Sequence, residues 1–582
     1  MSTDTTSPTA PTDRWRPLST LRWRALAAAG GLATAASTLL AWTWTAEFPG
    51  DLTIYGYPGG LQILTLIGGL VTTLIALSAL GLTGLRWLTP AGSTQALRLA
   101  ALGTFATTWF TVIAITVDLG GLVNLEPGGY VAAATSAIPA ALSFLIPDDT
   151  RPAKRPKALA SWLEILIIVA VFAAALQILT YGIDIDDDDS EEFVGYLITV
   201  GFGAATLLKS GLAARLSALT RNHQTSTVTA AFLTAAAFPF TQSDDQYLQL
   251  GVNILIFATV ALGLNVVVGL AGLLDLGYVA FLGVGAYTAA LVSGSAASTL
   301  DIHFPFWAAV PTGALVALIF GVLIGAPTLR LRGDYLAIVT LGFGEIFRIA
   351  VNNLDGSSGP KVTNGPDGIP NIPDLHMFGY DFGAEHTIGG FRLGSFANYY
   401  LLMLLFTVLV VLVFSRAGNS RIGRAWVAIR EDETAATAMG INGFRLKLIA
   451  FALGATLAGI AGTVWAHTQY TVVPEQYVFS GPVAPNSAFL LAAVILGGMG
   501  TISGPLVGAA LLFLIPEKLT FLQDYQLLAF GVALILLMRF RPEGLIPNRR
   551  QQLEFHEPEQ DQPDAPARGI DPPAVGVTKA EA

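Results

Sequence analysis

Long apolar runs recur along almost the whole chain and are separated by short polar or glycine-rich segments. A helix that crosses a bilayer needs roughly 20 mostly apolar residues, and most of these runs are close to that length. About six lie in the first part of the sequence, near 25–45, 61–82, 97–117, 129–147, 160–181 and 194–214. About ten follow, near 226–241, 247–270, 276–293, 305–327, 335–352, 399–415, 448–466, 486–497, 503–516 and 525–540. The pattern predicts an all-α polytopic membrane protein with about 16 transmembrane helices, about 6 in an N-terminal extension and about 10 in a core.

Lysine and arginine residues mark alternate loops between these runs. They precede the first run and recur near 86–98, 151–157, 215–221, 330–332, 416–447 and 539–550. The intervening loops, such as 184–192, are neutral or acidic. Because cytoplasmic loops carry the excess of positive charge, both termini are predicted to be cytoplasmic. The run from Ala25 to Trp44 is longer than the apolar region of a signal peptide, so it is predicted to stay as a first span.

The composition narrows the class of protein further. Hydrophobic residues make up 53% of the 582 residues and charged residues only 12%, about half the share of a soluble protein. This argues against a soluble enzyme, and the net charge of −10 argues against a nucleic-acid partner. The absence of cysteine excludes disulfides, thiolate catalysis and cysteine-ligated zinc.

These patterns predict three regions. Residues 1–225 form a transmembrane extension without a recognisable motif, and its role as an assembly module, a lipid-facing stabiliser or a separate fused unit is left open. Residues 226–548 form the core. Residues 549–582 are rich in Pro, Asp, Glu and Gln and are predicted to be a disordered cytoplasmic tail.

The sequence contains no catalytic or metal-binding motif. A Walker A loop ends in Gly-Lys-Ser/Thr, whereas the only lysine followed by Ser or Thr, Lys209, is preceded by Leu208. The acidic run at 184–192 lacks the glycine and glutamate of a calcium loop at the required spacing. The six histidines form no HExxH pair. The chain is therefore predicted not to be an enzyme and to hold no metal or cofactor.

A charge within a span is costly and commonly functional, and three charged residues in or beside predicted spans of the core are candidates on this ground. Asp275 lies in the glycine-rich stretch 269–277, where it either caps a helix at a break or takes part in transport. Glu345 and Arg348 are three positions apart, so they share a helix face and can pair, either for structure or for transport.

Two glycine-rich segments, 263–285 and 497–508, interrupt predicted spans. In a membrane such interruptions persist only where they are buried or line a cavity, and paired interruptions point to a transport path. The alternative is close helix packing through small residues. The candidate path residues are Asn265, Gly272, Asp275, Gly277, Tyr278, Glu345, Gly497, Gly498 and Gly500.

The loop at 416–447 is long, rich in arginine and placed between two predicted spans. Its residue types favour one helix over 425–439, and Gly440 is suited to end it. The apolar side chains that this helix could present are Trp426, Ile429 and Met439. Such a loop is suited to docking a cytoplasmic partner.

The segment Glu433-x-Ala435-Ala436-x-x-x-Gly440 within this loop resembles the EAA loop of ABC importer permeases, which seats on the ATPase subunit. Its surroundings resemble the LivM-type branched-chain amino acid permeases. The similar stretches are Gly423–Glu433, Gly263–Asn265, Gly272–Phe281, Gly285–Tyr287, Leu329–Ala337, Thr340–Glu345, Asn364–Ile369, Gly497–Thr501 and Arg541–Leu545. Because these ordered motifs extend over about 226–548, the core is identified as a member of this family.

The resemblance implies a permease subunit of a binding-protein-dependent ABC importer in the bacterial cytoplasmic membrane, with a branched-chain or similar amino acid as substrate. It also implies two cytoplasmic ABC ATPase subunits that hold ATP and Mg, a second, LivH-like permease subunit and an extracytoplasmic solute-binding protein. The residues expected to couple the loop to the ATPases are Arg424, Arg430, Glu431, Glu433, Ala435, Ala436 and Gly440, with Glu433 and Arg430 as polar docking contacts. A urea or short-chain amide permease, an ion-coupled secondary transporter and a non-transporting membrane scaffold remain alternatives.

Overall fold

The computed structural model describes residues 18–546. The gaps in this range are Glu47, Pro49, Thr83, 150–159, 187–188, Ser243, Asp301, 332–333, Ser358, 389–390, 482–485, 520–524 and Pro542. The tail predicted at 549–582 lies outside the described residues.

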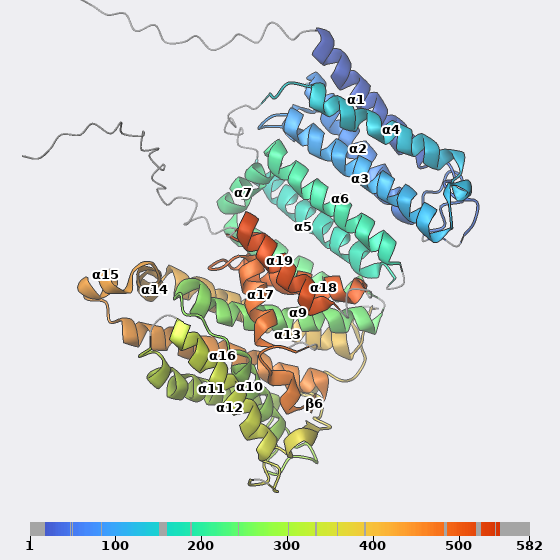
Figure 1. Cartoon of the computed structure of the whole chain (residues 1–582). Helices are drawn as coiled ribbons and strands as arrows, with labels where there is room; N and C mark the ends of the chain where they lie inside the picture. Colours follow the sequence, from blue (N-terminus) through green and yellow to red (C-terminus); the bar gives the residue numbers. More distant parts are fainter. Residues whose placement is uncertain are drawn as a thin grey trace, which may run out of the picture.

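Seven α-helices lie in the described part of the extension. They are α1 (Leu18–Ser37), α2 (Gly60–Leu80), α3 (Thr94–Asp118), α4 (Pro127–Leu145), α5 (Ser161–Asp184), α6 (Ser190–Ser210) and α7 (Leu212–Asn222). Helices α1 to α4 lie together at one end of the molecule, and α6 packs against α3 (Figure 1). The glycines on α1 and α2 permit this close approach, because a Cβ atom at Gly69 would lie 2.9 Å from the carbonyl oxygen of Gly31.

The remaining helices form the core. They are α8 (Gln224–Ala237), α9 (Asp245–Asn265), α10 (Val279–Val292), α11 (Phe306–Thr328), α12 (Asp334–Asn353), α13 (Ser395–Asn419), α14 (Arg421–Glu431), α15 (Glu433–Ala438), α16 (Gly443–Gln469), α17 (Ser487–Gly497), α18 (Ser503–Lys518) and α19 (Gln526–Phe540). Helix α9 crosses the interior of this group and is buried almost throughout its length (Figure 1). Its sequence is apolar on every side, as expected for a central helix.

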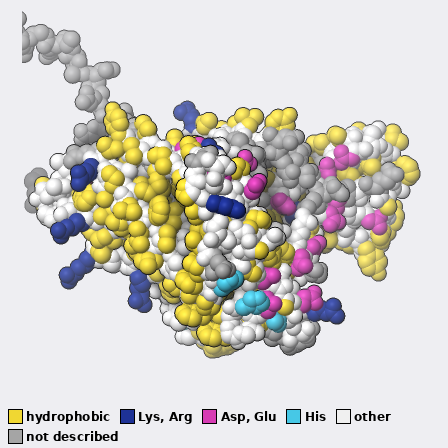
Figure 2. All heavy atoms as spheres, turned by 90° about the horizontal axis from the view of Figure 1, so that it is seen from below, with side chains coloured by type: hydrophobic (Ala, Val, Ile, Leu, Met, Phe, Trp, Pro, Cys, Tyr) yellow, Lys and Arg dark blue, Asp and Glu magenta, His cyan; other side chains and the backbone are white. Residues whose placement is uncertain are grey.

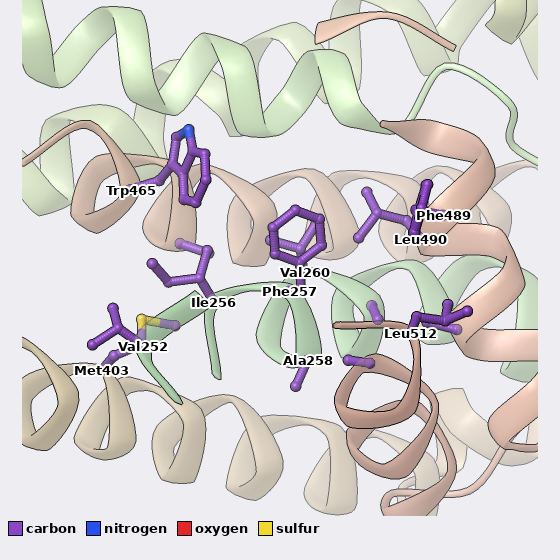
Figure 3. Packing of buried hydrophobic residues seen from close by; sticks show 14 of the residues in the cluster. Val252, Ile256, Phe257, Ala258, Val260, Met403, Trp465, Phe489, Leu490 and Leu512 are labelled. Atoms are coloured by element: carbon purple, nitrogen blue, oxygen red, sulfur yellow. The ribbon is translucent and has the colours of Figure 1, made fainter. Parts of the chain in front are cut away.

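The packing around α9 joins helices that are distant in the sequence. Val252, Ile256 and Phe257 of α9 face Met403 of α13 and Trp465 of α16, while Phe489, Leu490 and Leu512 of α17 and α18 close the other side (Figure 3). The rings of Phe257 and Trp465 meet edge to face with centroids 5.9 Å apart. Edge-to-face pairs of this kind add specific geometry to apolar packing.

Three short antiparallel strand pairs lie near one end of α13 and α16. They are β1 (Ile369–Pro370) with β6 (Thr471–Val472), β2 (His376–Met377) with β3 (Tyr380–Asp381), and β4 (His386–Ile388) with β5 (Phe391–Leu393). In the first pair Ile369 lies opposite Val472. Strand β5 precedes α13 and β6 follows α16, whereas α14 and α15 connect the other ends of these two helices. The strands and the pair α14–α15 therefore mark opposite ends of the core.

Ten helices in the described parts of the chain are long and apolar enough to cross a membrane. They are α2, α3, α4, α5, α6, α9 with its continuation to Leu270, α11, α12 from Tyr335, α13 and α16. Shorter apolar helices lie at Val279–Val292, Ser487–Gly497 and Leu528–Phe540. The predicted class, an all-α polytopic membrane protein, is confirmed, and the count of about 16 spans stays a prediction. The runs predicted near 25–45 and 226–241 fold as α1 and as the short helix α8.

Side-chain types are segregated on the surface. In the face shown in Figure 2, most Lys and Arg side chains lie along one side, and Asp, Glu and His side chains gather toward the other, with hydrophobic side chains between them. Because cytoplasmic ends of spans carry the excess of positive charge, the basic side is the predicted cytoplasmic one, and this orientation stays a prediction.

Lys518 at the end of α18 connects the core to the extension. Its side chain is fully buried, and its Nζ donates a hydrogen bond of 2.5 Å to the carbonyl oxygen of Ile185, which follows α5. The same ammonium group lies 4.2 Å from the ring centroid of Tyr247 on α9. A desolvated cation over an aromatic face is a favourable contact, so this lysine helps to hold the two parts together.

Candidate functional site

The first glycine-rich segment is a break between α9 and α10. Helix α9 passes at Asn265 into one π-helical turn, Val266–Leu270, and Gly272 then takes a left-handed backbone with φ +71°. Regular helix resumes only at Val279. Most of this break is buried within the core, where non-helical backbone is tolerated in a membrane protein.

Asn265 joins this break to the second glycine-rich segment. Its side chain is fully buried, and its Nδ2 donates a 2.7 Å hydrogen bond to the carbonyl oxygen of Thr501. Its Oδ1 accepts a 2.8 Å hydrogen bond from the amide of Gly500. The two segments, predicted separately from the sequence, are therefore in direct contact.

Asp275 organises the turn that leads into α10. The carboxylate is buried, and its Oδ1 accepts a 3.0 Å hydrogen bond from the amide of Gly277. The next amide, that of Leu276, donates to Thr340 Oγ1 on α12 at 3.0 Å. Gly277 is needed here because a Cβ atom would lie 1.9 Å from the carbonyl oxygen of Thr340. Asp275 thus holds a turn ahead of α10 and does not cap the helix, because Tyr278 occupies the N-cap position. A role of Asp275 in transport stays a prediction.

Tyr278 fixes the same turn to α16. Its hydroxyl group donates a 2.6 Å hydrogen bond to the carbonyl oxygen of Gly454. A Cβ atom at Gly263 would lie 2.3 Å from this hydroxyl oxygen, so the glycine leaves room for it. The start of α10 is held from a third side by Ser487, whose Oγ accepts the amide of Val279 at 3.1 Å.

Gly497, Gly498 and Gly500 lie where α17 ends. Gly498 and Gly500 have φ values of +125° and +74°. A Cβ atom at Gly498 would lie 2.2 Å from the carbonyl oxygen of Ile546, whose amide donates to the Gly497 carbonyl oxygen at 2.9 Å. Close backbone packing accounts for glycine at 497 and 498, and a positive φ accounts for glycine at 500. Their place on a transport path stays a prediction.

Glu345 lies apart from the other candidate path residues. It is on α12, its side chain is 49% exposed, and it pairs with Arg348 as the spacing predicts. Arg348 Nε donates to Glu345 Oε1 at 3.0 Å and to Oε2 at 3.1 Å. This ion pair is therefore exposed on the surface of α12, a helix that is apolar enough to cross a membrane.

The loop predicted as one helix over 425–439 forms two helices, α14 and α15, and the prediction is wrong at Asp432. This residue has an extended backbone, and its Oδ1 accepts the amides of Thr434 and Ala435 at 2.8 and 2.9 Å. An aspartate that caps a new helix competes with continuation of the preceding one. Gly440, with φ +85°, follows the end of α15 as predicted.

The predicted coupling residues divide into exposed and internal groups. Arg424, Glu431 and Ala435 are exposed, and Ala436 is buried. Glu433 Oε1 lies 2.7 Å from Nζ of Lys447, a buried lysine on α16. Glu433 therefore anchors α15 to α16 with one side chain.

The apolar side chains of the loop also divide. Trp426 and Ile429 are buried, and Trp426 Nε1 donates a 2.7 Å hydrogen bond to the carbonyl oxygen of Leu446. Their predicted presentation at the surface is therefore wrong, because α14 packs this face on α16. Met439 is 83% exposed and does present an apolar surface.

Arg430 connects α14 to the break after α9. Its Nη1 donates a 2.7 Å hydrogen bond to the carbonyl oxygen of Gly269, in the π-helical turn. Its aliphatic part packs on Gly272, where a Cβ atom would lie 2.5 Å from Arg430 Cγ. In this chain the guanidinium group of Arg430 therefore reaches the break, and its contact with a partner stays a prediction. Sequence reasoning missed this contact and the roles of Thr340 and Ser487.

Within the described ranges, no group of three or more His, Cys, Asp or Glu residues could hold a metal ion. The groups gathered at the break are backbone amides, carbonyls, one buried carboxylate and aromatic hydroxyls. They can hold backbone geometry and bind polar groups, and they include no nucleophile paired with a base.

Multiple apolar spans, a broken helix in the interior and short polar helices at one end define a multi-pass membrane protein of the transport-permease class. Residues 246–538 match the family described as branched-chain amino acid transport system permease component, and the chain belongs to this family.

Individual relatives agree with this assignment. The chain is 40% identical over 338 residues to the high-affinity branched-chain amino acid transport system permease protein LivM of Salmonella typhimurium, covering 55% of this chain and 74% of the relative. LivM of Escherichia coli is similar to the same extent. LivH of Salmonella typhimurium is 24% identical over 301 residues, covering 50% of this chain and 91% of LivH. No solved structure matches the chain.

Proposed function

We propose that the chain is the permease subunit of a binding-protein-dependent ABC importer for branched-chain amino acids in the bacterial cytoplasmic membrane. The proposal is supported by the role of its LivM relatives in branched-chain amino acid transport and by the position of α14 and α15 at one end of the core. ATP and Mg belong to two partner ATPase subunits, and this chain performs no catalysis itself.

The observation that carries the coupling mechanism is the contact between Arg430 and the break after α9. ATPase subunits that move α14 and α15 would displace Arg430, and with it the carbonyl group of Gly269. The backbone at Gly272 is left-handed and held against Arg430, so displacement of α14 would be transmitted to the break. Arg424, Glu431 and Met439 are exposed and supply polar and apolar contacts for the ATPases.

The second permease subunit would cover α12. A charged side chain within a span faces the protein interior or a water-filled cavity, because exposure to lipid is costly. The Glu345–Arg348 pair is open to the outside of this chain, so a LivH-like subunit would enclose it and the two chains would share the transport path. A solute-binding protein would then dock at the opposite end from α14, where the short strands lie.

The function is tested by expressing the chain with its ATPases, a LivH-like subunit and a binding protein, and measuring uptake of radiolabelled leucine. Replacing Glu433 and Gly440 together should abolish uptake while membrane insertion and ATP hydrolysis persist. Normal uptake in this variant would overturn the coupling role of the loop.

The same assay separates the alternatives. Competition by urea or acetamide rather than by isoleucine and valine would indicate an amide permease. Uptake that survives ATP depletion but not loss of the ion gradient would indicate a secondary transporter. Uptake that does not require this chain would indicate a scaffold.

A further inference from the structure

An apolar groove of about 620 Å³ lies in the extension, between α2, α3, the outer end of α5, and α6. Its walls include Ile67, Val71 and Leu74 of α2 and Val200 and Leu207 of α6, all of them exposed. Its floor is made of small residues, including Gly68, Ala100 and Gly103. A Cβ atom at Gly103 would lie 2.5 Å from Phe202 Cβ, and one at Gly68 would lie 2.9 Å from Thr104 Oγ1, so these glycines let the helices beneath the groove pack closely.

The depth of the groove in the membrane limits what can fill it. Helices α2, α3 and α6 are each long and apolar enough to span a bilayer, so the groove lies within hydrocarbon. The α2 residues that line it extend from Ile63 to Ile75, which is roughly 18 Å along a helix. One leaflet of a bilayer is about 15 Å thick, so the groove can accommodate an acyl chain of that leaflet along its length.

The predicted cytoplasmic end of the groove is basic. Leu88 and Leu212 line this end, and Arg86, Lys209 and Arg215 flank them in the sequence. Arg215 Nη1 donates a 3.2 Å hydrogen bond to the carbonyl oxygen of Trp87, which brings the two basic segments together. Arg215 Nε is buried and, within the described part of the chain, has no hydrogen-bond partner.

Carboxylates do not neutralise this end. The segments 80–92 and 199–222 contain no acidic residue. The acidic residues at the nearby helix ends face other basic groups. Asp148 lies 3.8 Å from Arg98, Asp149 lies 3.6 Å from Arg24, and Glu164 lies 2.8 Å from His223. The positive charge at the groove is therefore available to an anion. Trp87 is 58% exposed at the same place, where an indole is favoured at the level of lipid headgroups.

We infer that the extension holds an anionic phospholipid of the surrounding bilayer, with an acyl chain in this groove and its phosphate group at Arg86, Lys209 and Arg215. The apolar walls recognise the chain, and the three basic side chains distinguish an anionic headgroup from a zwitterionic one. This gives residues 1–225 a binding function of their own, independent of the transport role of the core.

The acyl-chain part is tested with two glycine variants on α6. Gly203 lines the groove and Gly201 does not, and no described heavy atom lies within 4 Å of a Cβ atom built at either position. Gly203→Leu therefore adds a side chain to the groove from an open Cβ position, and Gly201→Leu adds the same side chain elsewhere on the helix. After purification of the full chain in a mild detergent, native mass spectrometry should show retained phosphatidylglycerol on the wild type and on Gly201→Leu. Gly203→Leu should retain several-fold less.

The headgroup part is tested in nanodiscs that contain phosphatidylglycerol and phosphatidylcholine. Replacing Arg86, Lys209 and Arg215 by glutamine should reduce the preference for phosphatidylglycerol by about fivefold for each residue. Arg416→Gln on α13 removes one charge away from the groove and should leave the preference unchanged. A monodisperse elution profile shows that each variant is folded.

Any one of several results would overturn the inference. They are a wild-type chain that retains no phospholipid, equal retention by the two glycine variants, and an unchanged lipid preference in the triple variant. Equal binding of both phospholipids to the wild type would likewise exclude the anionic headgroup.

Discussion

Arg430 and Gly269 are 161 positions apart in the chain and are joined by a hydrogen bond of 2.7 Å from guanidinium to carbonyl. The bond ties a short helix outside the predicted spans to a break in the central helix of the core. A hydrogen bond from a charged donor to a buried carbonyl group is stronger than one from a neutral donor, and its strength depends on the geometry of the donor.

Arg430→Gln should uncouple transport. Losing a charge-assisted hydrogen bond costs about 1.5–3 kcal/mol, so leucine uptake should fall roughly tenfold or more in proteoliposomes. ATP hydrolysis should persist, because the partner ATPases remain intact. Arg421→Gln, at an exposed position on the same helix to which no ATPase contact is assigned, serves as the control. Equal loss of ATP hydrolysis in Arg430→Gln would instead indicate a docking role.

Gly272→Ala should also impair uptake, because the added methyl group would disturb the contact between Arg430 and the break after α9. The residue has φ +71°, and an added Cβ atom would lie 2.5 Å from Arg430 Cγ. Gly120→Ala is the matched control, because Gly120 lies in the extension, has φ +78° and has no described heavy atom within 4 Å of its Cβ position. Both variants carry backbone strain, and only Gly272→Ala displaces Arg430. Similar uptake in the two variants would argue against the contact.

Breaking the Glu433–Lys447 pair should destabilise the loop. Lys447 is buried, so Glu433→Gln leaves its ammonium group without a carboxylate, at a cost of about 1–3 kcal/mol after allowance for the partial exposure of Glu433. Adding Lys447→Met should recover most of that loss, which thermal melting of the single and double variants would measure. A double variant that is no more stable than Glu433→Gln would contradict the pairing.

Replacing both Glu345 and Arg348 by leucine should weaken assembly. If a second permease subunit encloses this pair, the double variant should copurify with less of that subunit and transport less leucine. An increase in stability with normal assembly would show that the pair faces lipid, since removing lipid-exposed charge is favourable.

Asp149 should make the extension sensitive to acid. Burial works against ionisation of this carboxyl, but hydrogen bonds from Ser93 and Thr94 outweigh it and lower its pKa below the usual range. A lowered pKa contributes stability that is present above the unfolded value near 3.9 and is lost as the pH falls through the lower folded value. The Asp149→Asn variant should therefore melt at a lower temperature than the wild type at neutral pH. It should also lose less stability than the wild type when the pH is lowered. Asp148→Asn, at a more exposed position, should resemble the wild type.

The sequence predicts features that depend on near neighbours. The Glu345–Arg348 pair follows from a spacing of three, and Gly440 follows from the residues that end helices. Asp432 shows the limit of such reasoning. Its charge suited the polar face of one continuous helix, but its side chain accepts two amide groups and starts a second helix.

Contacts between distant segments could not be predicted in this way. The inward direction of Arg430 depends on how α14 packs against α16, and Asn265 reaches Gly500 only once the core has folded. No periodicity connects residues more than 160 positions apart. The two glycine-rich segments could be identified from the sequence, but their contact could not.

The bond between Lys518 and the carbonyl oxygen of Ile185 has a consequence for any truncation of this protein. Deleting residues 1–225 removes an acceptor that the core uses to hold a buried ammonium group. A truncated core that fails to transport leucine could therefore be damaged in its own packing. Combining the deletion with Lys518→Met separates the two causes, because methionine fills similar space and needs no acceptor. The N-terminal helices thus take the place of water around the buried ammonium group of Lys518. Removing them changes the surroundings of this residue in the core.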